Sequence, residues 1–506
     1  GGSGNVTLQA NGTSSDITVN QVVSSSAGNI TANAGKDITI ASTVVTGGNI
    51  DLTATKGSMT LQQVTATIGN ITAKAGTDLS ADTLTSAADI NLNAAQDITA
   101  NNLTAKGSAT MTAGQDISAT GIKAGDKATM TAGNNLTATT VEAVNDMNLT
   151  ATSGKLTLKQ AVTTVGNMTA KAGTDLSADT LTSAADIDLN AAQDITANNL
   201  TAAGSATMTA GQDITATGIK AGTTATMVAA RNLTATTVEA GTGINMTATS
   251  GNAELEQVKT TATTGNITAT AGIDLIADAL TAAGDIGLTA DNDIVANNVT
   301  ASGSATMTAG NDLTATTVDA GTGISLITTN GSMTLQQVAA TAGNITAQAG
   351  TNLSADTLKA VDIGLVAGQN MTAKNLTGSG SATMNAVQGI TATGINAGNT
   401  VTMTAGNNLT ATTVEAVKGI DLTATSGHLT LEQAVTTAGN ITAKAGTDLS
   451  ANAISATGDI SLNAGRDVTS NNLTTTGSTT MMAGQDIKAT GIKAGTTATM
   501  VAARNL

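Results

Sequence analysis

The amino-acid sequence predicts an all-β fold, a right-handed parallel β-helix in which about 19 residues form each coil. Three observations support this prediction. A short apolar pattern recurs with a nearly constant period along all 506 residues. Within each period the apolar residues alternate with polar ones, as in a strand with one buried side. The composition has 55 Gly but no Pro, Cys, Phe, Trp or Tyr.

The period is measured between the first apolar residues that follow successive turns. There are 25 such markers from Ile30 to Ala498, and of the 24 intervals 17 are 19 residues long and four are 21. A period near 20 is typical of a solenoid, with one supersecondary unit per repeat. About 25 coils stacked about 4.8 Å apart predict a rod about 120 Å long. We expect residues 1–506 to form a single continuous repeat region that is a fragment of a longer exoprotein.

The segment "GNITAKAGTDLSADTL" at residues 69–84 shows why the coil is built of strands. Ile71, Ala73 and Ala75 alternate with polar residues, and after Gly76 the alternation resumes at Leu79. Thr and Ile favour strands, whereas frequent Gly weakens helices. A leucine-rich repeat has a similar length, but its consensus is absent. The pattern therefore predicts three short strands per coil, with a right-handed crossover as in most parallel sheets.

A second-order repeat is superimposed on the coils. Long coils begin at Ile50, Met147, Ile244, Ile324 and Ile420, and four coils plus one long coil give a super-repeat of 97 residues. We expect the extra residues to form bulges, either structural corrections of twist or candidate interaction sites. The exposed tips of these bulges would be Gln63, Gln160, Gln257, Gln337 and Gln433.

Composition and charge exclude several classes of function. The net charge is −16, which argues against nucleic acid or an anionic membrane surface as the partner. No apolar run approaches the length of a membrane span. The absence of Cys excludes disulfides and thiol chemistry. No cofactor is expected.

A column of Asp and Asn precedes the second strand of most coils. We interpret it as a structural ladder whose side-chain oxygens accept hydrogen bonds from turn amides. The alternative, Ca²⁺ bound between stacked carboxylates, is possible but not favoured, because the Ca²⁺-binding nonapeptide pattern is absent. The column begins with Asp37, Asp78, Asp97, Asp116, Asn135, Asp175, Asp194 and Asp213.

Other features have ordinary explanations. The only His, His428, takes the place of Lys155 in an earlier long coil, so no catalytic role is assigned to it. Sequons such as those at Asn29 and Asn102 arise because the coil requires a turn Asn, an inward aliphatic residue and an outward Thr in succession, although they could carry sugar. Outward Thr pairs resemble those of ice-binding β-helices, but strand propensity explains them.

Coils of the form "GNITAKAGTDLSA" in a chain without Pro resemble the shaft repeats of filamentous haemagglutinin-type proteins, the large exoproteins of Gram-negative two-partner secretion. The resemblance covers residues 5–506. It implies a secreted, cell-surface β-helical shaft that extends a distal adhesive or toxic tip, in cell adhesion, biofilm formation or contact-dependent interaction. It also implies an outer-membrane transporter as partner, and a host or bacterial receptor bound by regions outside this segment.

Three alternatives remain open. The chain could assemble laterally with copies of itself into a fibre or surface layer. It could be a polysaccharide-acting enzyme on a β-helix, for which an acidic cluster that breaks the repeat is expected and is not seen. It could also bind ice. We expect a structural protein and not an enzyme.

Overall fold

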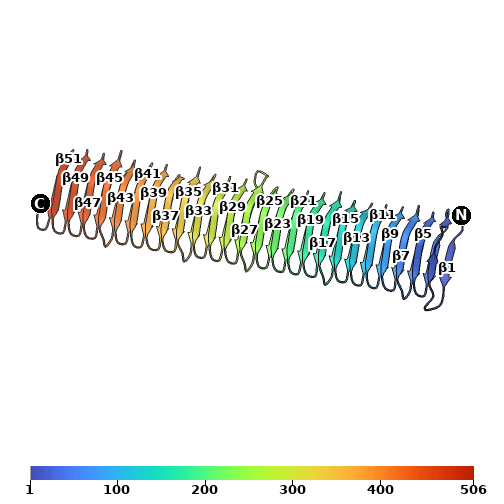
Figure 1. Cartoon of the computed structure of the whole chain (residues 1–506). Coiled ribbons are helices and arrows are strands. Elements are labelled where there is room, and N and C mark those ends of the chain that lie inside the picture. The colour runs from blue at the N-terminus through green and yellow to red at the C-terminus, as the bar shows by residue number, and fades with distance from the viewer. Residues whose placement is uncertain (1) are drawn as a thin grey trace. The chain divides into compact units, whose positions relative to one another are not determined.

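The computed structural model describes residues 2–506 and confirms the predicted fold class. The described residues form 52 β-strands and no helix, so they contain no helix that could cross a membrane. Each coil consists of a short strand, usually of five residues, and a long strand, usually of eight. The chain divides into two compact units, Gly1–Gly251 and Asn252–Leu506. Figure 1 labels β1 and the long strands of both units from β5 to β51.

Unit 1 contains strands β1 to β26. Its short strands are β1 (Val6–Ala10), β4 (Ile30–Ala34), β6 (Ile50–Ala54), β8 (Ile71–Ala75), β10 (Ile90–Ala94), β12 (Ala109–Ala113), β14 (Ala128–Ala132), β16 (Met147–Ala151), β18 (Met168–Ala172), β20 (Ile187–Ala191), β22 (Ala206–Ala210), β24 (Thr224–Ala229) and β26 (Gly243–Ala248). Its long strands are β5 (Ile38–Thr46), β7 (Met59–Ala66), β9 (Leu79–Ser86), β11 (Ile98–Ala105), β13 (Ile117–Ala124), β15 (Leu136–Ala143), β17 (Leu156–Thr163), β19 (Leu176–Ser183), β21 (Ile195–Ala202), β23 (Ile214–Ala221) and β25 (Leu233–Ala240). In the first coil the long strand is split into β2 (Ile17–Val19) and β3 (Val23–Ser25), and both pieces pair with β5.

Unit 2 contains strands β27 to β52. Its short strands are β28 (Asn266–Ala271), β30 (Ile286–Ala290), β32 (Ala305–Ala309), β34 (Ile324–Thr328), β36 (Ile345–Ala349), β38 (Ile363–Ala367), β40 (Ala382–Ala386), β42 (Thr400–Ala405), β44 (Gly419–Ala424), β46 (Asn440–Ala445), β48 (Ile460–Ala464), β50 (Thr479–Ala483) and β52 (Ala498–Ala502). Its long strands are β27 (Ala253–Thr260), β29 (Leu275–Ala282), β31 (Ile294–Ala301), β33 (Leu313–Ala320), β35 (Met333–Ala340), β37 (Leu353–Ala360), β39 (Met371–Gly378), β41 (Ile390–Ala397), β43 (Leu409–Ala416), β45 (Leu429–Thr436), β47 (Leu449–Ala456), β49 (Val468–Thr475) and β51 (Ile487–Ala494).

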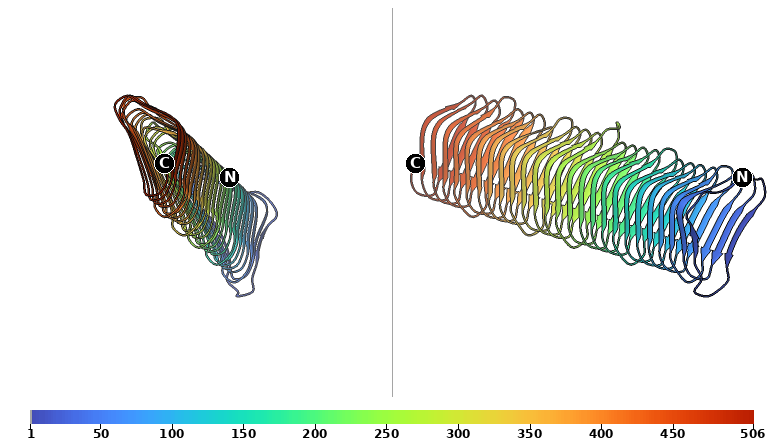
Figure 2. Two further views of the ribbon diagram at one scale, coloured as in Figure 1. Left: turned by 90° about the vertical axis from the view of Figure 1, so that its left-hand side faces the viewer. Right: turned by 45° about the vertical axis from the view of Figure 1, so that its right-hand side comes forward.

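Within each unit, every strand pairs in parallel with the equivalent strand of the next coil. Ile90 of β10, for example, lies between Ile71 of β8 and Ala109 of β12, and this register continues along the whole strand. The long strands stack in the same way, so the coils of a unit repeat one outline (Figure 2). Because each coil adds about 4.8 Å, the 13 short strands of each unit stack over roughly 60 Å.

The third corner of the coil lies inside the long strand. In β11 the burial alternates except at Asn101 and Asn102, two consecutive residues that both point outward. Asn102 has a φ of 48°, and in the next coil Gly121 occupies the same corner with a φ of 69°. Asn and Gly are the residues that adopt this left-handed conformation at least cost. The predicted second and third strands are therefore one bent strand, because hydrogen bonding to the next coil continues on both sides of the corner.

The core is a single narrow column of aliphatic side chains within each unit. In β12 and β13 the inward residues are mainly Ala, Met and Ile, and all are at most 3% exposed. Leu103 lies in register between Leu84 and Ile122, and all three are at most 1% exposed. Since half the contacts of each coil are made with its neighbours, no coil buries its core alone.

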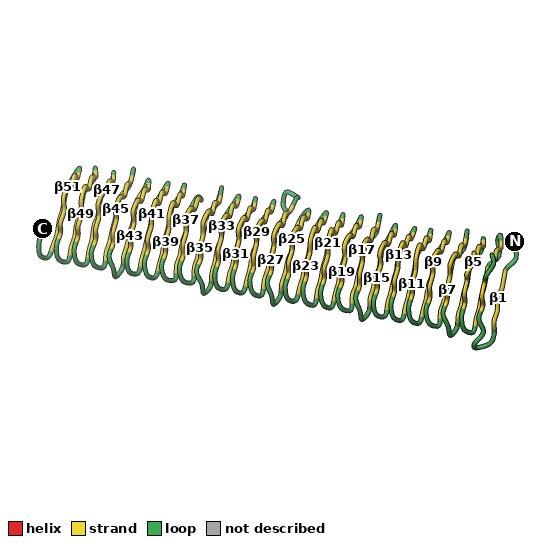
Figure 3. Tube along the Cα trace, viewed as in Figure 1, coloured by secondary structure: helices red, strands yellow, loops and turns green. Residues whose placement is uncertain are grey.

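The extra residues of the long coils lie in turns. We call the turn from short to long strand turn A and the turn from long to short strand turn B. An ordinary coil has three residues in each, as at residues 114–116 and 125–127, whereas the coil that begins at Ile50 has four in each, at 55–58 and 67–70. The widest turn of unit 2 lies between β27 and β28 and stands out from its neighbours in Figure 3.

Candidate functional surface

The predicted bulges at the five Gln residues are wrong. Gln63 lies inside β7, in register with Thr43 and Thr83, and the Thr43 hydroxyl donates a hydrogen bond of 2.9 Å to its Oε1. The physical reason is that a residue inserted into a strand breaks ladder hydrogen bonds, whereas one inserted into a turn does not. The other Gln residues are likewise exposed and in register within long strands, namely Gln160, Gln257, Gln337 and Gln433.

The Asp/Asn column forms a ladder along turn A, which we call ladder A. In each rung the side-chain Oδ1 accepts a hydrogen bond from the backbone N–H of the equivalent residue one coil later. The distances are 2.9 Å from Asp116 to Asp97, 2.8 Å from Asn135 to Asp116 and 2.9 Å from Lys155 to Asn135. Similar rungs join the remaining members, with Asp37 accepting from Ser58, Asp78 from Asp97, Asp194 from Asp213 and Asp213 from Asn232. Asp175 instead forms an ion pair of 2.7 Å with Lys155.

A second ladder along turn B, ladder B, was missed by the sequence analysis. In most coils it uses the residue directly before the first inward residue of the short strand. The N–H of Asn49 donates to Asn29 at 2.8 Å, that of Asn70 to Asn49 at 2.9 Å and that of Asp89 to Asn70 at 2.8 Å. The signal in the sequence is the recurrence of Asn, Asp or Ser before most apolar markers, which indicates turn residues but not the bonds between coils. Asn29 and Asn70 are thus structural, since their oxygens satisfy turn amides of the next coil.

Buried hydroxyls close the wide turns. The Thr163 Oγ1 is buried and donates to the carbonyl of Gly166 at 2.8 Å, within the turn B of a long coil. The Ser86 hydroxyl in the coil after another long coil donates to the Gly69 carbonyl at 2.8 Å. Among the described residues, Thr479 alone has a buried side-chain oxygen with no hydrogen-bond partner. The inner carbonyl groups of the wider turns therefore accept hydrogen bonds from these hydroxyls and not from water.

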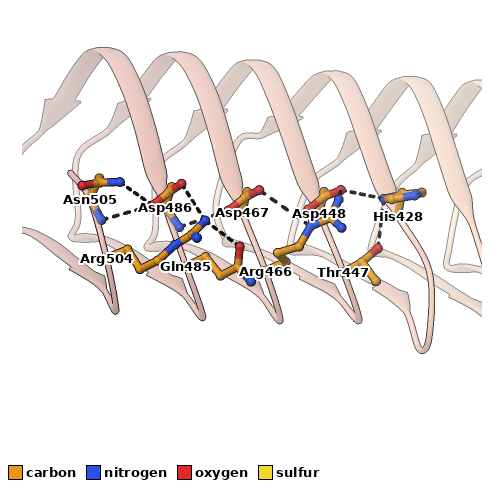
Figure 4. A network of polar contacts seen from close by, with 9 residues as sticks. All are labelled: His428, Thr447, Asp448, Arg466, Asp467, Gln485, Asp486, Arg504 and Asn505. Carbon is orange, nitrogen blue, oxygen red and sulfur yellow. Dashed lines mark hydrogen bonds and ion pairs between the residues drawn. The ribbon is translucent and has the colours of Figure 1, made fainter.

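Charged residues gather most closely on ladder A of unit 2 (Figure 4). His428 Nδ1 lies 3.1 Å from the Asp448 carboxylate and 2.9 Å from the Thr447 hydroxyl. On its other side Asp448 pairs with the Arg466 guanidinium through both carboxylate oxygens. This bond from Arg466 holds the pKa of Asp448 below its ordinary value. Arg504 repeats the arrangement two coils later, donating to Asp486 at 3.1 Å and to Gln485 at 2.7 Å.

The chemistry of this network is that of an exposed ion-pair chain. His428 occupies the place that Lys155 has in unit 1, where Lys155 pairs with Asp175, and His428 is 57% exposed. A shallow hollow of about 390 Å³ lies beside it, and its lining residues are His428, Leu429, Thr430, Asp448, Leu449, Ser450, Asp467 and Thr469. Exposed pairs of this kind contribute little to stability, typically below about 1 kcal/mol each.

No group of three His, Asp or Glu residues in the described part of the chain is close enough to hold a metal ion. Elsewhere on the ladders, carboxylate pKa values are lowered by local donors. The Lys36 ammonium lowers the pKa of Asp37, and the backbone N–H and hydroxyl of Ser304 lower that of Asp285. Each of these carboxylates serves as a hydrogen-bond acceptor that holds one coil on the next.

Comparison of the chain with protein-family models, with curated proteins and with solved structures finds no match. The repeated geometry of coils, ladders and corners is therefore the basis for a functional proposal.

Proposed function

We propose that the chain is a structural shaft of a large secreted cell-surface adhesin, which holds a distal adhesive or toxic tip away from a Gram-negative cell. The observation that carries this proposal is the parallel pairing of successive coils within each unit, which continues past a register shift between Ile40 and Thr43 of β5. Successive coils can only lengthen such a stack, because both strands of every coil pair with the coil before and the coil after. A protein built in this way gains length with each repeat and little else.

The surface chemistry is consistent with a spacer. Outward positions are mainly Thr, Ser, Asn and Asp, and the repeated carboxylates are used in ladders that join coils. The resemblance to two-partner exoproteins adds secretion through an outer-membrane transporter and a receptor bound by regions outside this segment. The role does not require catalysis, and we propose that the chain is not an enzyme.

A deletion of one super-repeat tests the shaft. Removal of residues 90–186 takes out 97 residues and joins Asp89 to Ile187, which recreates the native junction Asp186–Ile187. The variant should fold, and its maximum dimension in small-angle scattering should fall by five coil spacings, about 24 Å. The sequence predicts about 120 Å for the full chain. A length below about 100 Å, or a deletion variant that becomes thinner without becoming shorter, would contradict the proposal.

A further inference from the structure

One face of the coil stack differs electrically from the rest of the molecule. We call it the short-strand face; it consists of two columns of outward residues, the second column directly after the first inward residue of each short strand and the fourth column two residues further on. Its charged side chains are three Asp and three Lys, so the face is neutral although the chain carries −16. All six side chains are exposed, and none forms an ion pair among the described residues. They are Asp51, Lys74, Lys171 and Asp188 in unit 1 and Asp421 and Lys444 in unit 2.

The six charges follow one geometric rule. Every Asp lies in the second column and every Lys in the fourth column, and each Asp has its Lys in an adjacent coil. Asp51 is in register with Thr72, two residues from Lys74, and Asp188 is in register with Thr169, two residues from Lys171. In one molecule the opposite charges are therefore diagonal across the face. Unit 2 repeats the rule, with Asp421 in register with Thr442, two residues before Lys444.

We propose that the short-strand face binds the same face of a second copy of this chain, about a two-fold axis parallel to the stacking direction. That rotation keeps the coil order and reverses the strand direction, so the second column of one copy faces the fourth column of the other. Asp51 of one copy then faces the fourth column of the other copy, and Lys74 of that copy lies in this column one coil further along the stack, a shift of about 4.8 Å. Sheets packed face to face are about 10 Å apart, a gap that a Lys and an Asp bridge together.

The order of charges disfavours the reverse orientation in the register that brings these charges together. In unit 1 the sequence of charges along the stack is Asp51, Lys74, Lys171, Asp188, which is the same read in either direction. If the second copy ran in the opposite direction with its β20 laid against β6, Asp51 would face Asp188 and Lys74 would face Lys171. Like charges brought together across an interface disfavour that arrangement. The parallel two-fold instead converts all four charges into pairs of opposite sign.

Side-chain size in unit 2, considered by itself, fits a two-fold axis parallel to the stacking direction of that unit, independently of charge. Val366 is 42% exposed as the fourth residue of β38, and the second residue of that strand is Gly364. A Cβ at Gly364 would meet no atom closer than 4.0 Å, so open space lies above it. The two-fold places Val366 of each copy over Gly364 of the other. In β34, Ile327 is 36% exposed and would likewise face Ser325, a small residue. Gly inside a strand is typical where another chain approaches closely.

Charge reversal on the full-length chain tests the proposal. The first variant, Lys74→Glu with Lys171→Glu, makes all four unit 1 charges acidic, and the second, Asp51→Lys with Asp188→Lys, makes them all basic. Each should dimerise at least about tenfold more weakly than the natural chain in sedimentation equilibrium. An equimolar mixture of the two should recover dimers, because every facing pair is again of opposite sign. A matched control, Lys56→Glu with Lys106→Glu, changes the net charge of the chain by the same amount, but at two residues in turns. It should dimerise nearly as the natural chain does.

Gly364→Leu provides a second, charge-independent test. The added side chain meets open space in its own chain, so the variant should fold, but it fills the space that Val366 of the second copy would enter. Dimerisation should fall at least about tenfold. A natural chain that stays monomeric at high concentration overturns the proposal, as do dimers that survive both charge variants. This inference goes beyond the shaft, since a monomer that is still elongated leaves the proposed shaft intact.

Discussion

Replacing Leu103 by Ala tests whether neighbouring coils share one core. Leu103 is fully buried between Leu84 and Ile122. The substitution removes three carbon groups, about 2.4 kcal/mol at about 0.8 kcal/mol each. The space left behind adds about 1 kcal/mol, because stacked strands cannot collapse into it. We therefore expect about 3.5 kcal/mol of local destabilisation, which corresponds to an approximately 300-fold loss of protection against hydrogen exchange.

The loss should be confined to the coils that contact residue 103. Hydrogen exchange followed by mass spectrometry should show it in peptides from β9, β11 and β13 and not in peptides from unit 2, since coils contact only their neighbours. Thr104→Ala is the matched control, because Thr104 is exposed on the same strand and its loss should change stability by less than about 0.5 kcal/mol. The reasoning is refuted if Leu103→Ala exchanges like Thr104→Ala, or if protection falls equally in both units.

Three further predictions concern the turns and corners. Asp97→Ala leaves the N–H of Asp116 without its acceptor, and should destabilise unit 1 by about 1 kcal/mol. An unchanged free energy of unfolding in chemical denaturation would argue against ladder A. Asn102→Gly should be tolerated, whereas Asn102→Val, a β-branched residue at a φ of 48°, should cost more than about 1 kcal/mol, and equal melting of the two variants would count against a strained corner. Arg466→Gln should raise the pKa of Asp448 towards its ordinary value in an NMR titration. In the natural chain, the stability that this carboxylate contributes is present above its unfolded pKa and is lost as pH falls through its lowered folded pKa. An unchanged titration would exclude the ion pair between Arg466 and Asp448.

Much of the fold followed from local sequence. The alternation at Ile71, Ala73 and Ala75 defines an inward-facing strand, and the structure buries all three. The position of Asp97 before a strand predicted its use as a turn acceptor, because Asx side chains commonly bond to turn amides. The strand and the acceptor are encoded within a few residues, whereas the donor, the N–H of Asp116, belongs to the next coil.

Features that depend on the neighbouring coil were predicted less well. The extra residues of the long coils were placed at Gln63 and its equivalents, but the structure places them in turns, where the ladder is not interrupted. Ladder B was overlooked because Asn70 and Asp89 are 19 residues apart in sequence, and their hydrogen bond exists only when the coils are stacked. The prediction of a single continuous region over residues 1–506 stays a prediction.

The sequence by itself determined the period, the strand character of the coil and the identity of the inward residues, because each follows from alternation and turn chemistry over fewer than 20 residues. Only the tertiary structure decided that the second and third strands are one bent strand at Asn102. It also decided that Asp51 and Lys74 lie diagonally on one exposed face. These are relations between coils, and their physical basis is the register of parallel hydrogen bonding, which a single repeat does not contain.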